Sequence, residues 1–377
     1  MWKTVKLGDL CQNLDRLRKP ITKKNRRSGI FPYYGASGVV DYVDDYLFDQ
    51  KLVLVGEDGA KWGAGSKTSF IINGKSWVNN HVHVLKPYSE VVMHEWITYY
   101  LNSINLQPWT TGLTIEKLNQ EKLSSIPIPH PPIEEQKKIV KKLDATFTEI
   151  DREVQNTNEI INLSNTNLKK IIDDKTKGND NWIEFKVKDL GIVKTGNTPK
   201  SSEKENYGSE IPFVKPPHFN SDGSITITDV GLSKKGSKLS RSAPANSVLM
   251  VCIGATIGKV GINNIDVCFN QQINSVTSSD KFDPELIYWQ MRGKRFQNDV
   301  IQNAGQATLP IINKSKWQNL SIFLPESPNE QIEIRTLLRK INTETENFIN
   351  NKLQKIQNLN ALKTAILKKA LLQSEAA

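Results

Sequence analysis

The chain has 377 residues, a hydrophobic content of 38% and a formal net charge of +10. This length has room for two domains of ordinary size, and the hydrophobic fraction is sufficient for packed cores, which excludes a globally disordered protein. The sequence has no run of 18 apolar residues and only three cysteines, without CxxC spacing, which excludes a membrane-spanning helix and a disulfide or structural zinc framework.

The opening residues, MWKTVKLGDL, are too polar for a secretion signal, so we expect a cytoplasmic protein that contacts no membrane. The basic excess favours an anionic partner. It is modest and is spread over the chain instead of forming a polybasic tail. This distribution suits recognition of a nucleic acid better than adhesion through bulk charge.

One sequence plan occurs twice in the chain. The two copies open with WKTVKLGDL at 2–10 and WIEFKVKDL at 182–190. Three more landmarks follow in the same order, namely 53–60 with 248–255, 79–82 with 270–273, and 129–136 with 325–331. A repeat with so long a period predicts two whole domains and not a solenoid of short units.

The first domain is expected at residues 1–132, with an α+β fold in which strands predominate. Short apolar runs lie between Gly, Asn, Asp or Pro residues, which is typical of buried strands and tight turns. These runs occupy 52–55, 70–72 and 82–85, and a helix is expected at 90–103.

A basic cluster lies near the start of this domain. Seven cations occur within a twelve-residue window, and two tyrosines and a Gly/Ser turn follow. Long cationic side chains beside such a turn and aromatic rings suit phosphate contacts and close approach to a DNA groove, although charge runs are more often solvated loops. The predicted DNA-binding residues of the domain are Arg16, Arg18, Lys19, Lys23, Lys24, Arg26, Arg27, Tyr33, Tyr34 and Lys61.

Three patterns that could indicate catalysis or metal binding fail. His81 and His83 could share a metal, but their repeat partners are Gln272 and Asn274, so core or hydrogen-bonded histidines are the better interpretation. The KPPH at 215–218 resembles an amino-methyltransferase motif, but its lysine cannot accept a hydrogen bond from an exocyclic amine. The glycines at 56–65 lack a phosphate-loop context. We therefore predict no catalytic residue and no metal site.

A first long helix is predicted within 133–178. From Gln136 to Ile171 an alternating 4,3 spacing places apolar residues at eight of eleven positions, without Pro or Gly. This heptad pattern predicts a coiled-coil helix, because a 3.6-residue stripe of this length would drift around the helix. An ordinary amphipathic helix on one domain is the alternative. The seam residues are Val140, Leu143, Phe147, Ile150, Val154, Ile161 and Leu168.

The second domain is expected at 179–327, with strands at 247–251 and 321–324 and a helix at 284–300. Its polar and basic residues fall at places comparable to those of the first domain. The predicted DNA-binding residues are Lys194, Asn197, Thr198, Lys200, Lys215, Lys234, Lys235, Lys238 and Arg241.

A second long helix is predicted within 328–374. Its apolar spacing shifts between Phe348 and Leu353, as a local stutter would produce. Two seams of matching length predict an antiparallel intramolecular pair, a rod of roughly 60 Å that separates the two domains. The seam residues of this helix are Leu338, Ile341, Phe348 and Ile356.

In this order, the repeated motifs resemble the DNA-specificity subunit of Type I restriction–modification systems, over essentially the whole chain. The residues that carry the resemblance are the Trp2 and Trp182 openings, GNTPK at 196–200, IPFVKP at 211–216, SVLMVCIGATIGKVG at 247–261, NNH and NQQ at 79–81 and 270–272, and the PPIEEQ and PNEQ helix entries.

The resemblance implies two target-recognition domains, each of which reads one half of a split DNA site, and a coiled coil that sets the half-site spacing. It also implies two methyltransferase subunits and two restriction/translocase subunits as partners. The subunit itself is expected to bind no cofactor, since S-adenosylmethionine, ATP and Mg are used by the partner subunits.

Two other function classes stay open from the residues alone. One is a methyltransferase or nuclease with an unrecognised motif, which would modify or cleave DNA by itself. The other is a scaffold whose coiled coil recruits proteins, which would bind no DNA at submicromolar concentration.

Overall fold

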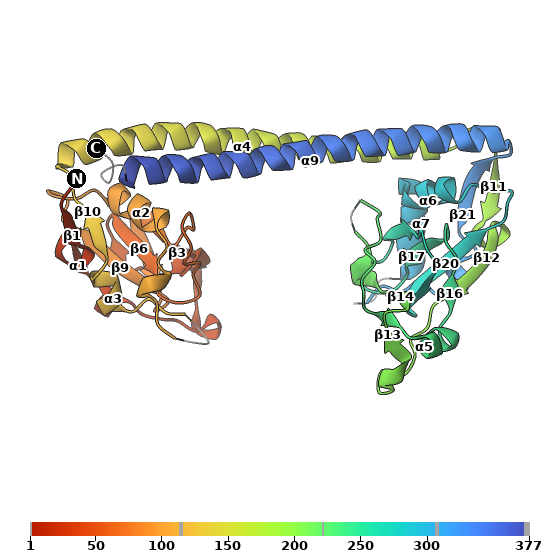
Figure 1. Ribbon diagram of the computed structural model, residues 1–377, viewed down its shortest axis with the longest axis horizontal. Helices are drawn as coiled ribbons and strands as arrows, with labels where there is room; N and C mark the ends of the chain where they lie inside the picture. Colours follow the sequence, from red (N-terminus) through yellow and green to blue (C-terminus); the bar gives the residue numbers. More distant parts are fainter. Residues whose placement is uncertain (1, 113–115, 221, 306–308, 373–377) are drawn as a thin grey trace. The chain divides into compact units, whose positions relative to one another are not determined.

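The computed structural model describes residues 2–112, 116–220, 222–305 and 309–372. The chain divides into two compact units: unit 1 comprises Met1–Asn158 and Lys352–Ala377, and unit 2 comprises Glu159–Asn351. Each unit contains one mixed domain and one part of each long helix, α4 (Ile133–Thr176) and α9 (Pro328–Leu372) (Figure 1). Among the residues described, no helix combines the length and the apolar character that a membrane span needs.

The domain of unit 1 contains three small sheets. Its elements are β1 (Thr4–Lys6), α1 (Leu7–Leu10), β2 (Cys11–Asn13), β3 (Ser28–Gly35), β4 (Gly38–Val43), β5 (Phe48–Asp49), β6 (Leu52–Gly56), β7 (Ser69–Ile72), β8 (Lys75–Val78), β9 (Val82–Pro87), α2 (His94–Ser103), α3 (Gln120–Ser124) and β10 (Pro127–Pro129). The sheet orders are β1-β10, β2-β9-β6-β7 and β4-β3-β8-β5. All neighbours are antiparallel except β3 and β8, which run parallel.

The domain of unit 2 repeats this topology. Its elements are β11 (Trp182–Lys186), β12 (Gly191–Thr195), β13 (Tyr207–Gly208), β14 (Ile211–Val214), β15 (Gly231–Leu232), α5 (Lys234–Leu239), β16 (Ser242–Ala243), β17 (Val248–Val251), β18 (Val260–Ile262), β19 (Val267–Phe269), β20 (Ile273–Ser278), α6 (Pro284–Arg292), α7 (Lys294–Ala304), α8 (Lys314–Trp317) and β21 (Ser321–Pro325). The sheet orders are β11-β21, β12-β20-β17-β18 and β13-β15-β14-β19-β16, again with one parallel pair, β14 and β19. The predicted α+β class and the duplication are confirmed.

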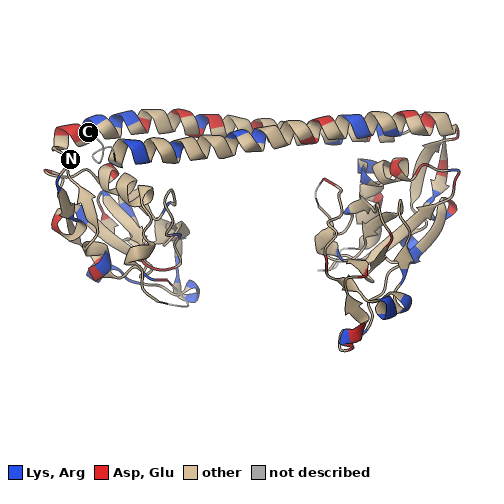
Figure 2. Cartoon of the chain, viewed as in Figure 1, with Lys and Arg blue, Asp and Glu red and all other residues tan. Residues whose placement is uncertain are grey.

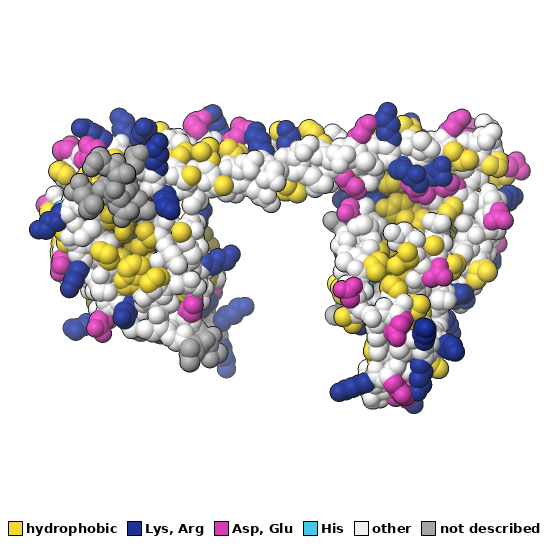
Figure 3. All heavy atoms as spheres, in the orientation of Figure 1, with side chains coloured by type: hydrophobic (Ala, Val, Ile, Leu, Met, Phe, Trp, Pro, Cys, Tyr) yellow, Lys and Arg dark blue, Asp and Glu magenta, His cyan; other side chains and the backbone are white. Residues whose placement is uncertain are grey.

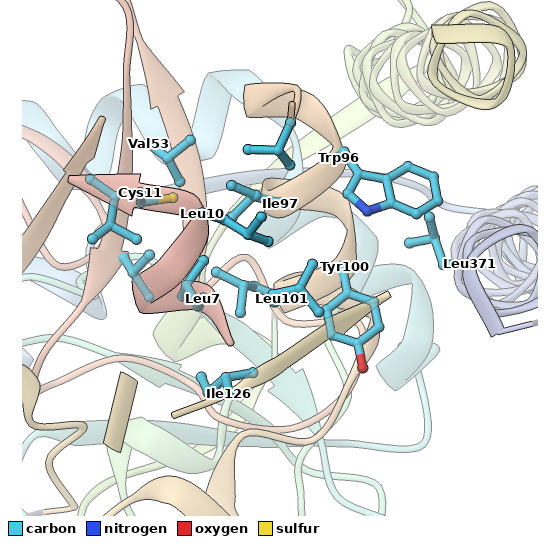
Figure 4. Close-up of a cluster of buried hydrophobic side chains, with 14 of the residues drawn as sticks. Leu7, Leu10, Cys11, Val53, Trp96, Ile97, Tyr100, Leu101, Ile126 and Leu371 are labelled. Atoms are coloured by element: carbon cyan, nitrogen blue, oxygen red, sulfur yellow. The ribbon is translucent and has the colours of Figure 1, made fainter. Parts of the chain in front are cut away.

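The repeated apolar runs form strands that are buried on both faces. In β6, Val53 and Val55 belong to one hydrophobic cluster, and Leu52 and Leu54 belong to another. Strand β17 divides its residues between two clusters in the same alternating way. Because successive side chains of a strand point to opposite faces, a continuous apolar run is what such a strand requires. Figure 4 shows the cluster around α2, in which Trp96, Ile97 and Leu101 lie among side chains from the strands and α1.

The predicted helix at 284–300 is in fact two helices, α6 and α7, which meet at Gly293. A Cβ atom at Gly293 would lie 2.5 Å from Thr176 Oγ1 of α4 and 3.2 Å from the Gln290 carbonyl oxygen. A side chain at position 293 would displace Thr176, and Gly293 itself is extended, with φ −64° and ψ 148°, which separates α6 from α7. The other predicted strands and helices are present with small shifts at their ends.

Within unit 1, parts of α4 and α9 pack against each other in antiparallel directions. Early α4 residues, Val140 to Ile150, share a core with the late α9 residues Leu367 and Leu371. Lys363 Nζ donates to Asp151 Oδ2 at 2.6 Å across this contact. Within unit 2, late α4 residues share a core with early α9 residues. None of the eleven positions of the predicted 4,3 seam of α4 is exposed.

The predicted seam positions of α9 are covered up to Thr345, and the next covered position is Ile349 instead of Phe348. Phe348, Leu353 and Leu362 are 42%, 45% and 49% exposed. From Thr345 onward the partly buried positions keep a 4,3 spacing, at Thr345, Ile349, Lys352, Ile356, Leu359, Lys363 and Ile366. Lysines occupy two of these positions. Lys363 does so because its Nζ lies 4.9 Å from the Phe147 ring centroid and also reaches Asp151, so that the stem packs while the charge is paired. A pattern that counts only apolar residues therefore assigns Phe348 to the seam, although Phe348 is exposed and two lysines lie in the seam instead.

The glutamine that closes each helix entry, Gln136 or Gln331, is fully buried. Gln136 Oε1 accepts from Met93 N at 3.0 Å, and Gln136 Nε2 donates to the carbonyl oxygens of Val91 and Pro131 at 3.0 and 2.9 Å. Gln331 Oε1 likewise accepts from Asp283 N at 2.9 Å, and Gln331 Nε2 donates to Pro325 O at 2.9 Å. In each unit this amide joins the long helix to the N-cap residue of α2 or α6.

Replacing Gln136 by alanine is expected to lower the free energy of unfolding of unit 1 by about 1–3 kcal/mol, because the Met93 N–H and the Pro131 carbonyl oxygen lose this partner. Urea denaturation monitored by tryptophan fluorescence measures the change. Gln357→Ala on the exposed side of α9 is the control and is expected to change stability by less than about 0.5 kcal/mol. Equal values for the two variants would contradict the structural role of the buried amide.

Candidate nucleic-acid interface

The basic segment of unit 1, residues 15–27, connects β2 to β3. Arg16, Lys19, Lys23, Lys24 and Arg27 are exposed, and none of them forms an ion pair with a residue that the structure describes. Figure 2 shows Lys and Arg in this unit on the loops at its lower end. Their charge is therefore available to an anionic ligand, as phosphate contacts require.

Arg26 and Tyr33 hold the basic segment in place. The Arg26 guanidinium lies 4.3 Å from the Tyr33 ring centroid, and its Nη1 donates to Asp41 Oδ2 at 3.1 Å. The Tyr33 hydroxyl accepts from Ile21 N at 2.9 Å, and Tyr33 is only 1% exposed. The structure corrects the prediction for Tyr33, whose buried ring offers no surface to DNA. Its role is to anchor the segment that carries the exposed cations.

Arg18 belongs to a buried charged cluster at the end of β2, β6 and β9. Arg18 Nη1 donates to Glu57 Oε2 at 2.6 Å and to Val82 O at 2.7 Å. The other carboxylate oxygen of Glu57, Oε1, lies 2.9 Å from Lys117 Nζ. The side chains of Arg18 and Glu57 are 15% and 13% exposed, so most of the Arg18 charge is used inside the domain.

The two histidines considered for a metal, His81 and His83, are hydrogen-bonded, as predicted. His83 Nδ1 lies 2.6 Å from Asp15 Oδ2, and His83 Nε2 lies 2.7 Å from Leu118 O. His81 Nδ1 lies 2.6 Å from Asp58 Oδ1. Over the described parts of the chain, no group of three or more His, Cys, Asp or Glu side chains could hold a metal ion.

The carboxyl groups of the charged cluster stay ionised at neutral pH. Burial raises the pKa of Glu57, but hydrogen bonds from Lys117 and Arg18 outweigh this effect and hold the pKa below its usual value. Burial also raises the pKa of Asp15, but its interactions with His83, the Val84 N–H and Arg18 together hold that pKa below its usual value. The pKa of Lys117 is raised, chiefly by its hydrogen bond to Glu57. The Glu57 carboxylate therefore pairs with the cations of Arg18 and Lys117.

In unit 2 the structure brings together three of the predicted residues. Asn197 Nδ2 donates to Leu239 O at 2.8 Å, and Asn197 Oδ1 accepts from Arg241 N at 2.7 Å. Arg241 Nη1 donates to Thr195 O at 2.7 Å, and Lys194 Nζ donates to Ser242 O at 2.8 Å. These bonds join the end of β12 to the segment after α5. The predicted Thr198, next in the chain, bonds through Oγ1 to Gln271 Oε1 at 2.5 Å.

The predicted lysines of α5 form a compact basic surface. Figure 2 marks Lys residues along this helix, and Figure 3 shows Lys and Arg side chains gathered in the same region. Lys235 pairs with Glu205, whereas Lys234 and Lys238 are exposed and make no ion pair with any described residue. A Cβ at Gly236 would lie 1.9 Å from Asn206 O, so the backbone of α5 packs directly on the turn at Lys204–Asn206. The scaffold thus fixes where these two free charges stand.

The other predicted residues lie apart from these groups. Lys200 pairs with Glu203 at 3.6 Å, and Lys215 Nζ lies 5.4 Å from the Phe213 ring centroid. Tyr34 packs against Phe70 with a centroid distance of 5.9 Å, and Lys61 is exposed between β6 and β7. A role in DNA binding stays a prediction for each of them.

Sequence reasoning missed Glu57 and Lys117. In the sequence, only the glycines around Glu57 were considered, and Lys117 was assigned to no group. Glu57 meets Arg18 across 39 positions of the sequence, so no local pattern could have joined them.

Comparison with known proteins gives consistent matches. The family model described as "Type I restriction modification DNA specificity domain" matches residues 1–162 and 179–358. A putative type I restriction enzyme specificity subunit of Haemophilus influenzae, S.HindORF215P, is 38% identical over 38% of this chain and 36% of its own length. The HindI specificity subunit of the same organism is 32% identical over 38% of this chain and 32% of its own length. The matched stretches thus span about one third of these relatives.

Two solved structures have the same fold over nearly the whole chain. One was determined to explain complex assembly and conformational transition of the type I R-M system; it has a TM-score of 0.74 at 18% identity and covers 98% of this chain and 97% of that chain. The other is the HsdS subunit from Thermoanaerobacter tengcongensis, with a TM-score of 0.51 at 17% identity, covering 98% of this chain and 96% of that chain.

Proposed function

We propose a function for this chain from the premise that it belongs to the family of the Type I restriction–modification DNA specificity domain, whose model matches both halves of the sequence. In this proposal the chain is the recognition subunit of a Type I restriction–modification complex. Each unit binds one half of a bipartite, asymmetric site in double-stranded DNA, and the chain itself catalyses no reaction.

One observation carries this proposal: the two units share a strand order but differ in the polar loops attached to it. Unit 1 presents a basic segment between β2 and β3, and unit 2 presents Lys234 and Lys238 on α5. Exposed cations neutralise phosphates, while neighbouring polar side chains read base edges. Two related scaffolds with different loops are suited to two different half-sites.

The chemistry in this proposal belongs to partner subunits. These are two methyltransferase subunits, which use S-adenosylmethionine, and two restriction/translocase subunits, which use ATP and Mg. Family membership supports this assignment. The exposed faces of α4 and α9 are the surfaces proposed for docking the methyltransferase subunits.

We expect binding to depend strongly on the spacing of the two half-sites, because the proposal makes α4 and α9 the elements that set it. One base pair changes the separation by about 3.4 Å and the rotation by about 35°. Lengthening or shortening the spacer by one base pair is therefore expected to weaken binding by roughly tenfold or more. The test selects a bipartite sequence from random duplexes with the full chain and measures affinity for spacer variants.

Duplexes with changed bases but an unchanged number of base pairs in the spacer serve as the control and should bind as the selected site does. Equal affinity for all spacer lengths would remove the role of the helices in spacing. Failure to bind any duplex at submicromolar concentration and low salt would remove the proposed function and favour a protein-recruiting scaffold.

A further inference from the structure

The charged cluster of unit 1 has no part in the function described so far. Its central residue is Glu57, which bonds at the same time to Arg18 of the basic segment and to Lys117. Lys117 pairs with Thr111 through two backbone hydrogen bonds of 2.8 Å. Glu57 therefore joins two surface segments that are far apart in the sequence, residues 15–27 and the strip formed by 109–111 and Lys117.

The bonds from Glu57 to Arg18 and Lys117 connect the two segments firmly. Both carboxylate oxygens of Glu57 are occupied by cations in a nearly buried position, where charge-assisted hydrogen bonds are stronger than in water. A second connection runs parallel to it, since His83 bridges Asp15 at the start of the basic segment and the Leu118 carbonyl oxygen. Of the trio Arg18, Glu57 and Lys117, only Lys117 reaches solvent, with 47% of its side chain exposed.

Unit 2 shows that the fold itself does not need this cluster. The backbone of Cys252 accepts from Ile312 N at 2.9 Å and donates to Gln272 O at 2.7 Å, just as the backbone of Glu57 accepts from Leu118 N and donates to His81 O. The bridge between Ile253 and Ile311 corresponds to the bridge between Asp58 and Lys117. Unit 2 thus forms the same backbone bonds with neutral side chains. At the positions that correspond to Asp15 and His83, Thr195 Oγ1 donates to Asn274 Oδ1 at 2.7 Å.

We propose that Glu57 is a positioning residue for DNA recognition by unit 1. Glu57 binds Arg18 of the basic segment and Lys117 of the second segment, which includes residues 109–111. These two segments thereby form one recognition surface. The described residues of unit 2 have neutral side chains at the corresponding positions, so the effect is expected in one half-site only. This inference rests on the proposed function.

The test is selection of binding sequences from a library of random duplexes by the full chain, with and without Glu57→Gln. The variant keeps the size of the side chain and removes its charge. One half of the selected bipartite sequence is expected to lose its base preference, with discrimination against single-base changes reduced by about tenfold, while the other half is retained. Affinity for unselected DNA is expected to be equal or higher, because an anion has been removed from the surface.

Glu90→Gln is the matched control, since Glu90 is an exposed acid of unit 1 outside the cluster and its loss changes the net charge equally. It should leave both half-sites intact, and Glu57→Asp, which keeps the charge, should restore part of the lost preference. If Glu57→Gln unfolds unit 1, Lys117→Met decides the question instead, because the Lys117 side chain is half exposed and its loss should weaken the same half-site.

Retention of both half-sites by folded Glu57→Gln or Lys117→Met would overturn the inference and leave the proposed function standing. Loss of preference in both half-sites by a folded variant would also overturn it. If the wild-type chain selects no bipartite sequence at all, the proposed function fails instead.

Discussion

Replacing Lys23, Lys24 and Arg27 together by glutamine is expected to weaken DNA binding by roughly tenfold or more near 0.1 M salt. The three side chains are exposed and form no ion pair with any described residue, so their replacement is expected to leave the free energy of unfolding nearly unchanged. Each DNA phosphate that the variant no longer neutralises lowers the slope of log affinity against log salt by about 0.9, so the slope is expected to fall by up to about 3. Titration of a labelled duplex at several salt concentrations measures both quantities.

A second triple variant controls for net charge. Lys3, Lys6 and Lys86 are exposed lysines of unit 1 on or next to β1 and β9, and their replacement by glutamine removes the same charge elsewhere. This variant should keep most of the salt slope. Similar slopes for the two triple variants would mean that only the total charge matters, and an unchanged slope in the first would place the basic segment away from DNA.

Phe147→Ala is expected to lower the free energy of unfolding of unit 1 by about 3–5 kcal/mol. The ring is 5% exposed and packs edge-on against Tyr99 of α2 with a centroid distance of 5.5 Å, while Lys363 of α9 lies over it. Its removal leaves a cavity where the domain and both long helices meet. Urea denaturation of the full chain measures the change, with the unit 1 transition expected to shift alone.

Asn342→Ala is the control for this prediction, because Asn342 stands as far beyond Gln331 as Phe147 stands beyond Gln136. Asn342 is only partly buried, and Asn342 Nδ2 bonds to Glu346 one turn further along the same helix. Its replacement should cost less than about 1 kcal/mol. An equally small loss for Phe147→Ala would show that the helices stabilise the domain of unit 1 much less than their shared core indicates.

Arg26 illustrates why a cation cannot be assigned to DNA from composition. Sequence reasoning grouped Arg26 with Arg27, yet Arg26 is paired with Asp41 and stacked on Tyr33, while Arg27 is free. Charge reversal at Arg26 would disturb the anchor of the whole segment and would weaken binding for an indirect reason. The basic-segment experiment therefore leaves Arg26 unchanged.

The duplication, the buried strands and the long helices could be predicted from the sequence, because each produces a repeated motif or a periodic pattern of apolar residues. An alternating 4,3 spacing marks one helix face, and an uninterrupted apolar run such as 52–55 marks a strand covered on both sides. The closing glutamines, Gln136 and Gln331, were visible as repeated landmarks, although their function as buried ties was not. A local apolar pattern can be recognised in the sequence without knowledge of the tertiary contacts.

Pairings between distant residues were decided only by the tertiary structure. Which cations are free, which lysines share the α9 seam, and how Glu57 joins Arg18 to Lys117 all depend on strand order and on the ends of strands that meet at one sheet edge. A charged side chain has the same local sequence signature whether it is solvated or paired with a residue far along the chain. Its partner is chosen by the three-dimensional fold, and so its role follows from that fold.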